Sequence, residues 1–523
     1  MGTVSRIRIS LYFMLSLAAA LKSGEPFQIR GWDIENFQPE YVYEMIDKAA
    51  SMNANTIGFS HEICMNVEEI IYDWHRYQHL VRFCDYAHRK GMKVFLWTHE
   101  VNGDIERWLD PMRPGENKRR LRADDPALYD YLTEKYRQAI DRVPNCDGFI
   151  LSLTESRWQV QRDNETVTRR TQAERMASVI NAVHRGCAEK GKILMVRDFL
   201  RSPSEMDSFL DALHRVPDDV WVYTKCVPND WEFSYPPHPL LGKVAPHKQV
   251  MELDLATEAG GIREMSMCIV DYVQKQLRLA AEKGLIGAIA RCDDGFSINK
   301  GTANEINVWS YGHLLNDPDK DTGKLWADWC RERYGEKGGS IAEHVLRQTF
   351  PIINKINYTL GFWTGSAGPD IGYSDGHLIR NSNALWDPSP KLKRIEAGLL
   401  HPTRAWIDTT VAEKAEAEAI AKSCIEFLDR HGSVLKGEDY QTLRENFERC
   451  IEHAQVGQRW ARAYYTLRRY RDVHSRQVLS ELENALKECD RFIADAPNRK
   501  WPRVNGLIAF VAQVRKEIGP ARN

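Results

Sequence analysis

The feature that most constrains the fold of this chain is a series of eight short apolar runs between Pro26 and about Leu315. The runs read FQIRGW, TIGFSH, KVFLWTH, GFILSLTE, ILMVRDF, VWVYTK, VMELDLA and IGAIARC. They do not alternate strictly between apolar and polar residues, so they suit strands that are buried on both faces, as in a parallel sheet.

Most of the segments between the runs have the periodicity of amphipathic helices. One of them, residues 262–284, has apolar side chains at helical spacing on one face, namely Ile262, Met265, Ile269, Val273 and Leu277. Eight strand signals over about 290 residues match the count and size of a (β/α)8 barrel. An open doubly wound sheet is the alternative, but no glycine-rich phosphate loop follows the first run.

The chain changes character after NDPDKD, residues 316–321, where the strand signal ends. Long periodic stretches follow, such as VAEKAEAEAIAKSCIEFLDRHG and SRQVLSELENALKECDRFIADAP. The sequence therefore predicts a catalytic barrel over residues 26–316 and an all-α domain over residues 317–523. The helical domain also offers a surface for a homodimer contact.

The first residues have the composition of a secretory signal. Arg6 and Arg8 precede the apolar stretch LYFMLSLAAAL, which ends in small residues. A frayed N-terminal helix is the other interpretation. No later run approaches the roughly 20 apolar residues that a membrane span needs. We therefore predict a signal peptide over residues 1–22 and an exported protein, periplasmic or extracellular, without a membrane span.

The composition and motifs of the chain limit the classes of partner and cofactor that we expect. The formal net charge of −2 gives no reason to expect nucleic acid as a partner. The eleven cysteines include no CxxC pair, so neither a disulfide framework nor a cysteine metal site is indicated. His61 and His99 are isolated rather than set at ligand spacing. No dinucleotide fingerprint is present, and we expect neither metal nor cofactor.

Active sites of barrel enzymes lie at the carboxyl ends of the strands. That end is rich in carboxylates and also carries basic residues and tryptophan: Trp32, Asp33, His61, Glu62, His99, Glu100, Glu155, Arg197, Asp198, Lys225, Asp230, Glu258, Asp293 and Asp294. Indole rings stack on the apolar faces of sugars, and sugar hydroxyls bond to acids and histidines. The residue types therefore indicate an oligosaccharide or polysaccharide substrate.

Glycoside hydrolysis needs a protonated carboxyl group on the leaving oxygen and an ionised carboxylate. Glu155, at the end of the fourth run, is our candidate acid, and Asp230 and Glu258 are the candidate bases. Asp230 lies in the sixth-to-seventh connection, whose residues 226–248 have no helical period, and long irregular loops are usually functional. Glu258 follows the seventh run. Each acid also has a structural interpretation, as a helix cap or in an Asx turn.

The stretch 220–260 resembles the α-glucuronidases of glycoside hydrolase family 67. In that family a lysine precedes an aspartate by five positions, and a glutamate follows the aspartate by twenty-eight, as Lys225, Asp230 and Glu258 do here. MVRDF resembles the family's Trp-Arg-x-Phe strand and places Arg197. NVWSYGHLLNDP resembles its Asn-Trp-Tyr-x-x-Gly segment and places Asn307. The likeness covers roughly residues 27–400.

The resemblance implies an inverting α-glucuronidase that removes α-linked (4-O-methyl)glucuronic acid from xylan-type oligosaccharides. Glu155 would be its general acid, and Asp230 and Glu258 its proposed bases. Arg197 and Lys225 would bind the carboxylate of the sugar, because a guanidinium fork suits a carboxylate.

Four further residues are candidates for substrate contacts, namely His99, Trp231, Asn307 and Asp294. Trp158, Trp231 and Trp309 are candidate stacking surfaces. In this chain LSLTESRWQV replaces the family's Lys-x-x-Ser-Glu-Gly-Gln-Pro. The family has an additional domain before its barrel, whereas here we expect the barrel to start almost directly after the predicted signal. A glycosidase for another sugar and a non-catalytic sugar-binding relative are the alternatives.

Overall fold

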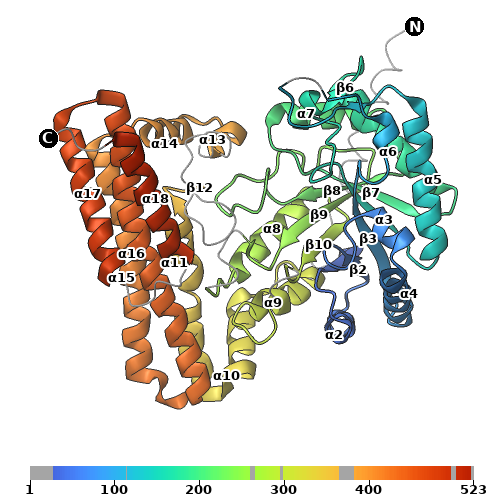
Figure 1. Ribbon diagram of the computed structural model, residues 1–523. Coiled ribbons are helices and arrows are strands. Elements are labelled where there is room, and N and C mark those ends of the chain that lie inside the picture. The colour runs from blue at the N-terminus through green and yellow to red at the C-terminus, as the bar shows by residue number, and fades with distance from the viewer. Residues whose placement is uncertain are drawn as a thin grey trace, which may run out of the picture.

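The computed structural model describes residues 27–112, 115–258, 265–294, 299–363, 382–495 and 502–519. The predicted signal peptide, residues 1–22, lies outside these residues. Eight parallel strands close into a barrel, shown at the right of Figure 1, in the order β1-β10-β9-β8-β7-β5-β3-β2. The prediction of an eight-stranded barrel is confirmed.

Each barrel strand falls within or next to one of the apolar runs. Their bounds are β1 (Ile29–Ile34), β2 (Thr56–Phe59), β3 (Lys93–His99), β5 (Gly148–Ser152), β7 (Ile193–Arg197), β8 (Trp221–Lys225), β9 (Gln249–Asp254) and β10 (Gly287–Arg291). The short strands β4 (Leu121–Arg122) and β6 (Thr166–Val167) pair with each other outside the barrel.

Helices connect the strands and cover the barrel: α2 (Pro39–Ser51), α3 (Val67–Tyr72), α4 (Trp74–Arg89), α5 (Pro126–Arg142), α6 (Gln172–Ala188), α7 (Pro203–Leu213), α8 (Val270–Glu282) and α9 (Glu305–Asn316). Several begin at side chains that cap the first turn, such as Asp73, Asp125, Thr171 and Ser202. The connection 226–248 contains neither helix nor strand, as its sequence predicted.

An apolar plug fills the barrel interior and carries charged residues directly above it. The plug consists of Ile29, Phe95, Trp97, Ile150, Met195, Tyr223, Val250 and Ile289. Successive side chains of a strand alternate in direction, so residues two positions further on also point inward. These include His99, Arg197, Lys225, Glu252 and Arg291. The carboxyl end of the barrel, hereafter the mouth, therefore has a floor of charged side chains.

The helix predicted over residues 262–284 begins later than its apolar period suggested, at Val270. The reason is visible in residues 266–269, whose four consecutive backbone N–H groups donate to side-chain oxygens rather than to helical carbonyls. The acceptors are Asn446, Asn304, Thr349 and Asn307, at 2.6–3.0 Å. Side chains from distant segments thus keep this segment out of the helix.

The C-terminal region is helical, with α10 (Thr322–Leu346), α11 (Thr349–Asn357), α13 (Asn383–Trp386), α14 (Pro390–Leu400), α15 (Arg404–His431), α16 (Gly437–Val473), α17 (Arg476–Asp495) and α18 (Pro502–Ile518). Figure 1 shows α15 to α18 standing as a bundle beside the barrel. A small hairpin, β11 (Tyr358–Thr359) and β12 (Phe362–Trp363), was not predicted. The all-α prediction is otherwise confirmed.

One hydrophobic core runs through both regions. It includes Leu277 of α8, Leu325 of α10 and Phe447 of α16. All eleven cysteines are buried and unpaired, so each serves as a small apolar side chain. Within the described parts of the chain, we find no helix with the length and hydropathy of a membrane span.

Candidate active site

The three predicted catalytic acids share one property at the mouth. The side chains of Glu155, Asp230 and Glu258 are 39%, 38% and 33% exposed. Each contacts a different buried cation: Arg197, Lys225 and Arg291 are 4%, 1% and 6% exposed. Accessible carboxylates thus lie above buried positive charges, which strands β7, β8 and β10 contribute.

Glu155 follows β5 and lies among three positive or ionisable groups. Its carboxylate is 3.6 Å from Nε2 of His99 and 3.9 Å from Nη1 of Arg197. Burial acts to raise the pKa of Glu155, but the His99 ring, the Arg197 guanidinium and the Lys225 ammonium outweigh it. They hold the pKa well below its usual range. In the free protein Glu155 is therefore ionised.

Arg197 has a second carboxylate partner that the sequence analysis did not identify. Its Nε and Nη2 donate to both oxygens of Glu252 on β9, at 2.7–3.0 Å, and Glu252 is fully buried. The guanidinium also lies over the rings of Trp97 and Phe199, at 4.4 and 4.7 Å. Its position is fixed, with Nη1 directed toward Glu155.

Lys225 lies at the centre of the charge network. Its Nζ donates to Oδ1 of Asp230 at 2.6 Å and lies near the rings of Phe199 and Trp231, 4.0 and 3.8 Å from their centres. Its charge also lowers the pKa of both Glu155 and Glu258 as one of several contributions. One ammonium therefore acts on all three candidate catalytic acids.

Asp230 is held by a buried neighbour. Its backbone N–H donates to Oε2 of Glu232 at 3.1 Å. Burial, followed by the Asp230 carboxylate, raises the pKa of Glu232 to about 8. Glu232 is therefore a neutral acid at pH 7, and it supports the Asp230 loop without adding a second negative charge.

Glu258 is fixed from two sides. Its backbone N–H donates to Oδ2 of Asp254 at 2.8 Å, and its carboxylate accepts from Nη1 of Arg291 at 2.7 Å. The other nitrogens of Arg291 donate to Glu35, which in turn lies 2.9 Å from Nδ1 of His61. Burial opposes the effect of Arg291, which nevertheless lowers the pKa of Glu258.

Several non-glycine residues at the mouth have positive φ angles. They are His61 (49°), Glu155 (60°), Asn229 (63°) and Thr257 (61°). Left-handed backbone is unfavourable for such residues, and it is found mostly at sites where surrounding contacts enforce it. Three of the four are, or directly precede, a candidate catalytic acid.

The remaining predicted residues lie elsewhere in the network. Asn307 is fully buried and bonds to the backbone at Leu255, Met267 and Ile269, so it braces the segment before α8 rather than facing the mouth. Asp294 follows β10 and is 8% exposed.

Two predicted tryptophans also lie away from the three acids. The indole N–H of Trp158 donates to the Arg119 carbonyl, and Arg157 and Lys118 lie over its ring, at 4.4 and 5.3 Å. Trp309 packs edge-on against His313 in α9, with ring centres 4.3 Å apart. The Trp158 side chain is 3% exposed, so it offers no open face to a sugar.

The sequence analysis missed Glu35, Glu232, Glu252 and Arg291. Glu252 and Arg291 lie inside apolar runs. Each follows a plug residue, Val250 or Ile289, by two positions, and this spacing indicates that its side chain also points into the barrel. Within the described ranges, no group of three or more histidine, cysteine, aspartate or glutamate residues could hold a metal ion.

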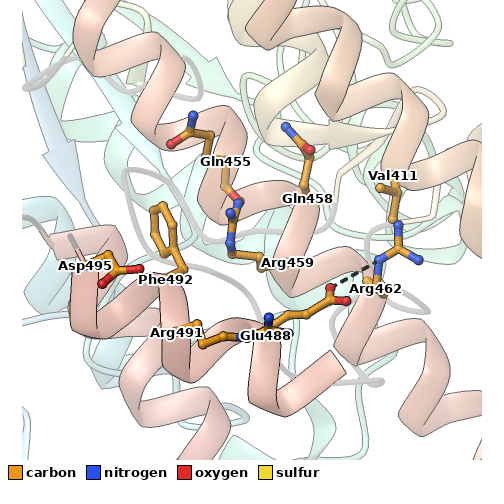
Figure 2. Close-up of a pocket in the computed structure, with 9 residues that line it drawn as sticks. All are labelled: Val411, Gln455, Gln458, Arg459, Arg462, Glu488, Arg491, Phe492 and Asp495. Carbon is orange, nitrogen blue, oxygen red and sulfur yellow. Dashed lines mark hydrogen bonds and ion pairs between the residues drawn. The ribbon is translucent and has the colours of Figure 1, made fainter. Parts of the chain in front are cut away.

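A hollow of about 700 Å³ also lies on the helical domain, between α15, α16 and α17 (Figure 2). Its lining includes Arg459, Arg462 and Arg491, and its two acids, Glu488 and Asp495, come from the same helix. Arg462 and Glu488 are 3.8 Å apart. None of the three accessible acids of the mouth belongs to this hollow.

Fold and site together define a (β/α)8-barrel protein whose mouth carries three accessible carboxylates over buried cations. Comparison of the sequence with protein-family models and with curated proteins gives no match. Among solved structures, the chain is similar to a GH138 enzyme that targets the pectin rhamnogalacturonan II. The TM-score is 0.62 at 11% identity, over 94% of this chain and 68% of that chain.

Two further structures have lower scores. One is a mutant O-GlcNAc hydrolase of Thermobaculum terrenum, with a TM-score of 0.47 and 10% identity over 94% of this chain and 95% of that one. The other is CpGH84B, with 0.44 and 13% over 94% and 77%. At such low identity the likeness to the GH138 enzyme establishes the fold, and the chemistry has to be argued from the mouth itself.

Proposed function

We propose that the protein is an exported, inverting glycoside hydrolase that removes an α-linked glucuronic acid, or its 4-O-methyl form, from a plant polysaccharide fragment. The observation that carries the proposal is that the three acids to which the family 67 resemblance gives catalytic roles each keep about a third of their side chain exposed at the mouth. The GH138 enzyme, which has a similar fold, targets a pectin, another plant polysaccharide.

The inverting mechanism of the proposal comes from the family 67 resemblance, and the strands show where its acid and bases would stand. Glu155 follows β5, Asp230 follows β8 and Glu258 follows β9, and β7 lies between β5 and β8 in the barrel. The acid and the two candidate bases therefore come from three different strand ends, with one or two strands between acid and base. An inverting mechanism needs about 6.5–9.5 Å between the carboxyl groups, with a water molecule between them. That water would attack the anomeric carbon while Glu155 protonates the leaving oxygen.

The charges around Glu155 give the substrate carboxylate a role in the reaction. A general acid must carry a proton, yet His99, Arg197 and Lys225 keep the pKa of Glu155 low in the free protein. A uronate bound against the two cations would offset their charge, and the pKa of Glu155 would rise. An acidic sugar would thus create the protonated acid that its own hydrolysis needs.

Asp230 and Glu258 both suit the role of base because each is paired with a cation, Lys225 or Arg291. Their backbone N–H groups are held by Glu232 and Asp254, which fixes the two carboxylates in place. Which of them takes the proton of the water depends on where the sugar ring lies. The pair is therefore proposed as a unit.

The test is hydrolysis of aldouronic oligosaccharides, with the anomeric configuration of the product followed by proton NMR. We expect β-glucuronic acid to be released first, and kcat to fall at least about a hundredfold in Asp230→Asn and Glu155→Gln. Asp319→Asn, a surface variant far from the mouth, should retain full activity. No release of uronic acid by a folded wild-type protein would reject the proposed substrate.

A neutral or differently charged sugar is the second candidate, and one observation favours it. The fork of Arg197 is already occupied by Glu252, and Lys225 is paired with Asp230. An incoming carboxylate would therefore compete with carboxylates of the protein. Hydrolysis of a neutral aryl glycoside, lost in Glu155→Gln, would favour this alternative over the uronic acid.

A further inference from the structure

Two neighbouring aromatic side chains are exposed at the corner between α3 and α4. Tyr72 is 74% exposed and Trp74 is 58% exposed. Among the large hydrophobic side chains that are most exposed in the described residues, these two are the aromatic ones. The two rings are two residues apart in the chain and leave apolar surface in water, whose burial by a ligand would be favourable.

This corner lies at the mouth end of the barrel. Helix α4 begins at Trp74 and follows the loop after β2 that carries His61. Arg76, in the first turn of α4, donates to the carbonyls of Glu62 and Ile63 in that loop. Its guanidinium also lies 5.4 Å from the centre of the Phe37 ring, which follows β1. The exposed rings are therefore tied to two mouth loops.

The corner is rigidly supported. Asp73 caps α4 by accepting from the Arg76 N–H at 3.1 Å. The loop after β3 packs closely on α3, since a Cβ atom at Gly103 would overlap the Glu68 carboxylate. The buried Lys135 bonds to both Glu68 and Glu100, at 2.7 and 2.8 Å. The backbone that carries the two rings is thus fixed before a ligand binds, which lowers the entropic cost of binding.

Further aromatic side chains, from α5 and from the loop after β3, pack near this corner. The Tyr72 side chain is close enough to Tyr131 on α5 to contribute to raising the pKa of Tyr131, whose main cause is burial. Tyr131 in turn lies 5.0 Å from the ring of Trp108, which the exposed Arg107 covers at 4.0 Å. Trp108 is 2% exposed, so these inner rings belong to the core that supports the corner, and the exposed aromatic surface is that of Tyr72 and Trp74.

We propose that Tyr72 and Trp74 form a distal sugar-binding surface, on which pyranose units of the substrate chain stack as the chain leaves the mouth. The inference rests on the proposed function, because it places the remote part of a polysaccharide relative to the three acids. It also predicts that the substrate is a chain of several sugars rather than a disaccharide.

A protein partner fits this surface less well than a sugar chain. Stable protein interfaces bury at least about 1,000 Å² and have an apolar centre. Here two rings are bordered by the exposed polar residues Asp73 and His75, and Trp74 packs edge-on against His75 at 4.9 Å. Narrow apolar faces with polar borders match the alternating apolar and hydroxyl surfaces of pyranose rings.

The experiment measures binding as a function of chain length. Calorimetric titration would use xylan- and pectin-derived oligosaccharides of about two to eight sugars, with wild type, Tyr72→Ala, Trp74→Ala, Trp74→Phe and the double alanine variant. Val473→Ala, which removes an exposed apolar side chain from the helical domain, is the matched control. Thermal melting would verify the fold of each variant.

We expect affinity in the wild type to rise with length, and the double alanine variant to lose about tenfold for the longer chains only. Trp74→Phe should retain most of the affinity, because it keeps a ring. Affinity that does not depend on length, or that is unchanged in the double variant, would overturn the inference. So would a change of oligomeric state in that variant, which would identify the surface as a contact between copies.

Failure of the proposed function would look different. Length-dependent binding without release of glucuronic acid would reject the proposed reaction while supporting the distal surface. Release of glucuronic acid with equal affinity for short and long chains would support the reaction and reject the surface. A wild-type protein that binds no chain of the series would reject the surface as well.

Discussion

Arg291 is a residue that joins several charges at the mouth. Its guanidinium bonds to Glu35 and Glu258, and burial would be costly for such a group without these partners. Glu35 is 1% exposed, so it depends on Arg291 and on His61 for compensation. Arg291 is absent from the residues predicted from the sequence, although it holds one of the predicted acids, Glu258, in place.

We expect Arg291→Gln to lower the free energy of unfolding by about 3–5 kcal/mol, because it leaves the buried Glu35 carboxylate without a full partner. The pKa of Glu258 should rise, since Arg291 now holds it low. Any activity that needs ionised Glu258 should then be lost at a higher pH on the acid side. Urea denaturation and a pH–rate profile measure the two effects. Arg278→Gln, which breaks an exposed pair with Asp319, should change neither.

Three aspartates at strand ends, Asp33, Asp198 and Asp254, are buried, and burial is the main cause that raises the pKa of each to about 7. Between about pH 4 and pH 7 the native state keeps these protons while the unfolded state has lost them. The native state then binds more protons, so stability falls as pH rises through this window. These three groups therefore make the free energy of unfolding of the protein smaller at neutral pH than at mildly acidic pH.

Asp33→Asn removes one of these ionisations while keeping an acceptor for the Ser60 hydroxyl. We expect the decline in unfolding free energy between about pH 5 and pH 7.5 to be about 2 kcal/mol smaller than in wild type. Denaturant titrations at the two pH values measure the difference. A decline as steep as that of wild type would mean that Asp33 is already ionised in the native state. Asp218→Asn, at an exposed position, is the control.

At the scale of the elements, strand packing depends on glycines at the start of two barrel strands. A Cβ atom at Gly148 or Gly287 would overlap the carbonyl oxygen of Ile193 or Ile29 on the neighbouring strand. Both backbones pair closely at these points, in the register Gly148↔Ile193 and Ile29↔Gly287. A neighbouring backbone cannot move aside as a flexible side chain can.

Gly287→Ala should therefore destabilise the protein by at least about 3 kcal/mol, because it forces two strands of a closed barrel apart. The control is Gly437→Ala in the first turn of α16, where a Cβ atom would meet no atom within 4 Å. That substitution should leave stability unchanged or increase it by up to about 1 kcal/mol. Equal stability of the two variants would contradict the close approach of β1 and β10.

The elements also show how far the sequence could lead. The eight strands were predictable because each apolar run is buried on both faces. The start of α8 was not, because four N–H groups of residues 266–269 are taken by side chains from distant parts of the chain, among them α9, α11 and α16. Such acceptors have no local signature in the sequence.

The same reasoning applies to the candidate site. Lys225, Asp230 and Glu258 could be found because they lie at strand ends and at motif spacing. The pairing of Arg197 with Glu252 and of Arg291 with Glu35 joins strands that are far apart in the sequence, so only the closed barrel reveals it. The closed barrel also determines which acids stay exposed, because the burial of a carboxylate depends on all the residues around it at the mouth.

At the scale of the whole molecule, the helical domain supports the loop that carries Asp230. Tyr358, directly after α11, is fully buried against Trp231, and its hydroxyl accepts from the Phe233 N–H at 2.9 Å. Asn383 of α13 donates to the Ser234 carbonyl at 3.0 Å. The loop 226–248 has no secondary structure of its own, so these contacts substitute for it. One core joins the two regions, and we expect them to unfold together.

Tyr358→Phe tests this support directly. The variant keeps the ring against Trp231 but removes the acceptor of the Phe233 N–H, at a cost of about 1 kcal/mol in overall stability. Because the loop has neither helix nor strand, we expect the loss to appear chiefly as faster amide exchange over residues 226–248, together with a lower kcat/KM. Tyr440→Phe removes a comparable hydroxyl contact, with Asp429 on the helical domain, and should leave exchange in the loop unchanged. If both variants exchange alike in this loop, the helical domain does not position Asp230. The support would then have to come from within the barrel, from Lys225 and Glu232.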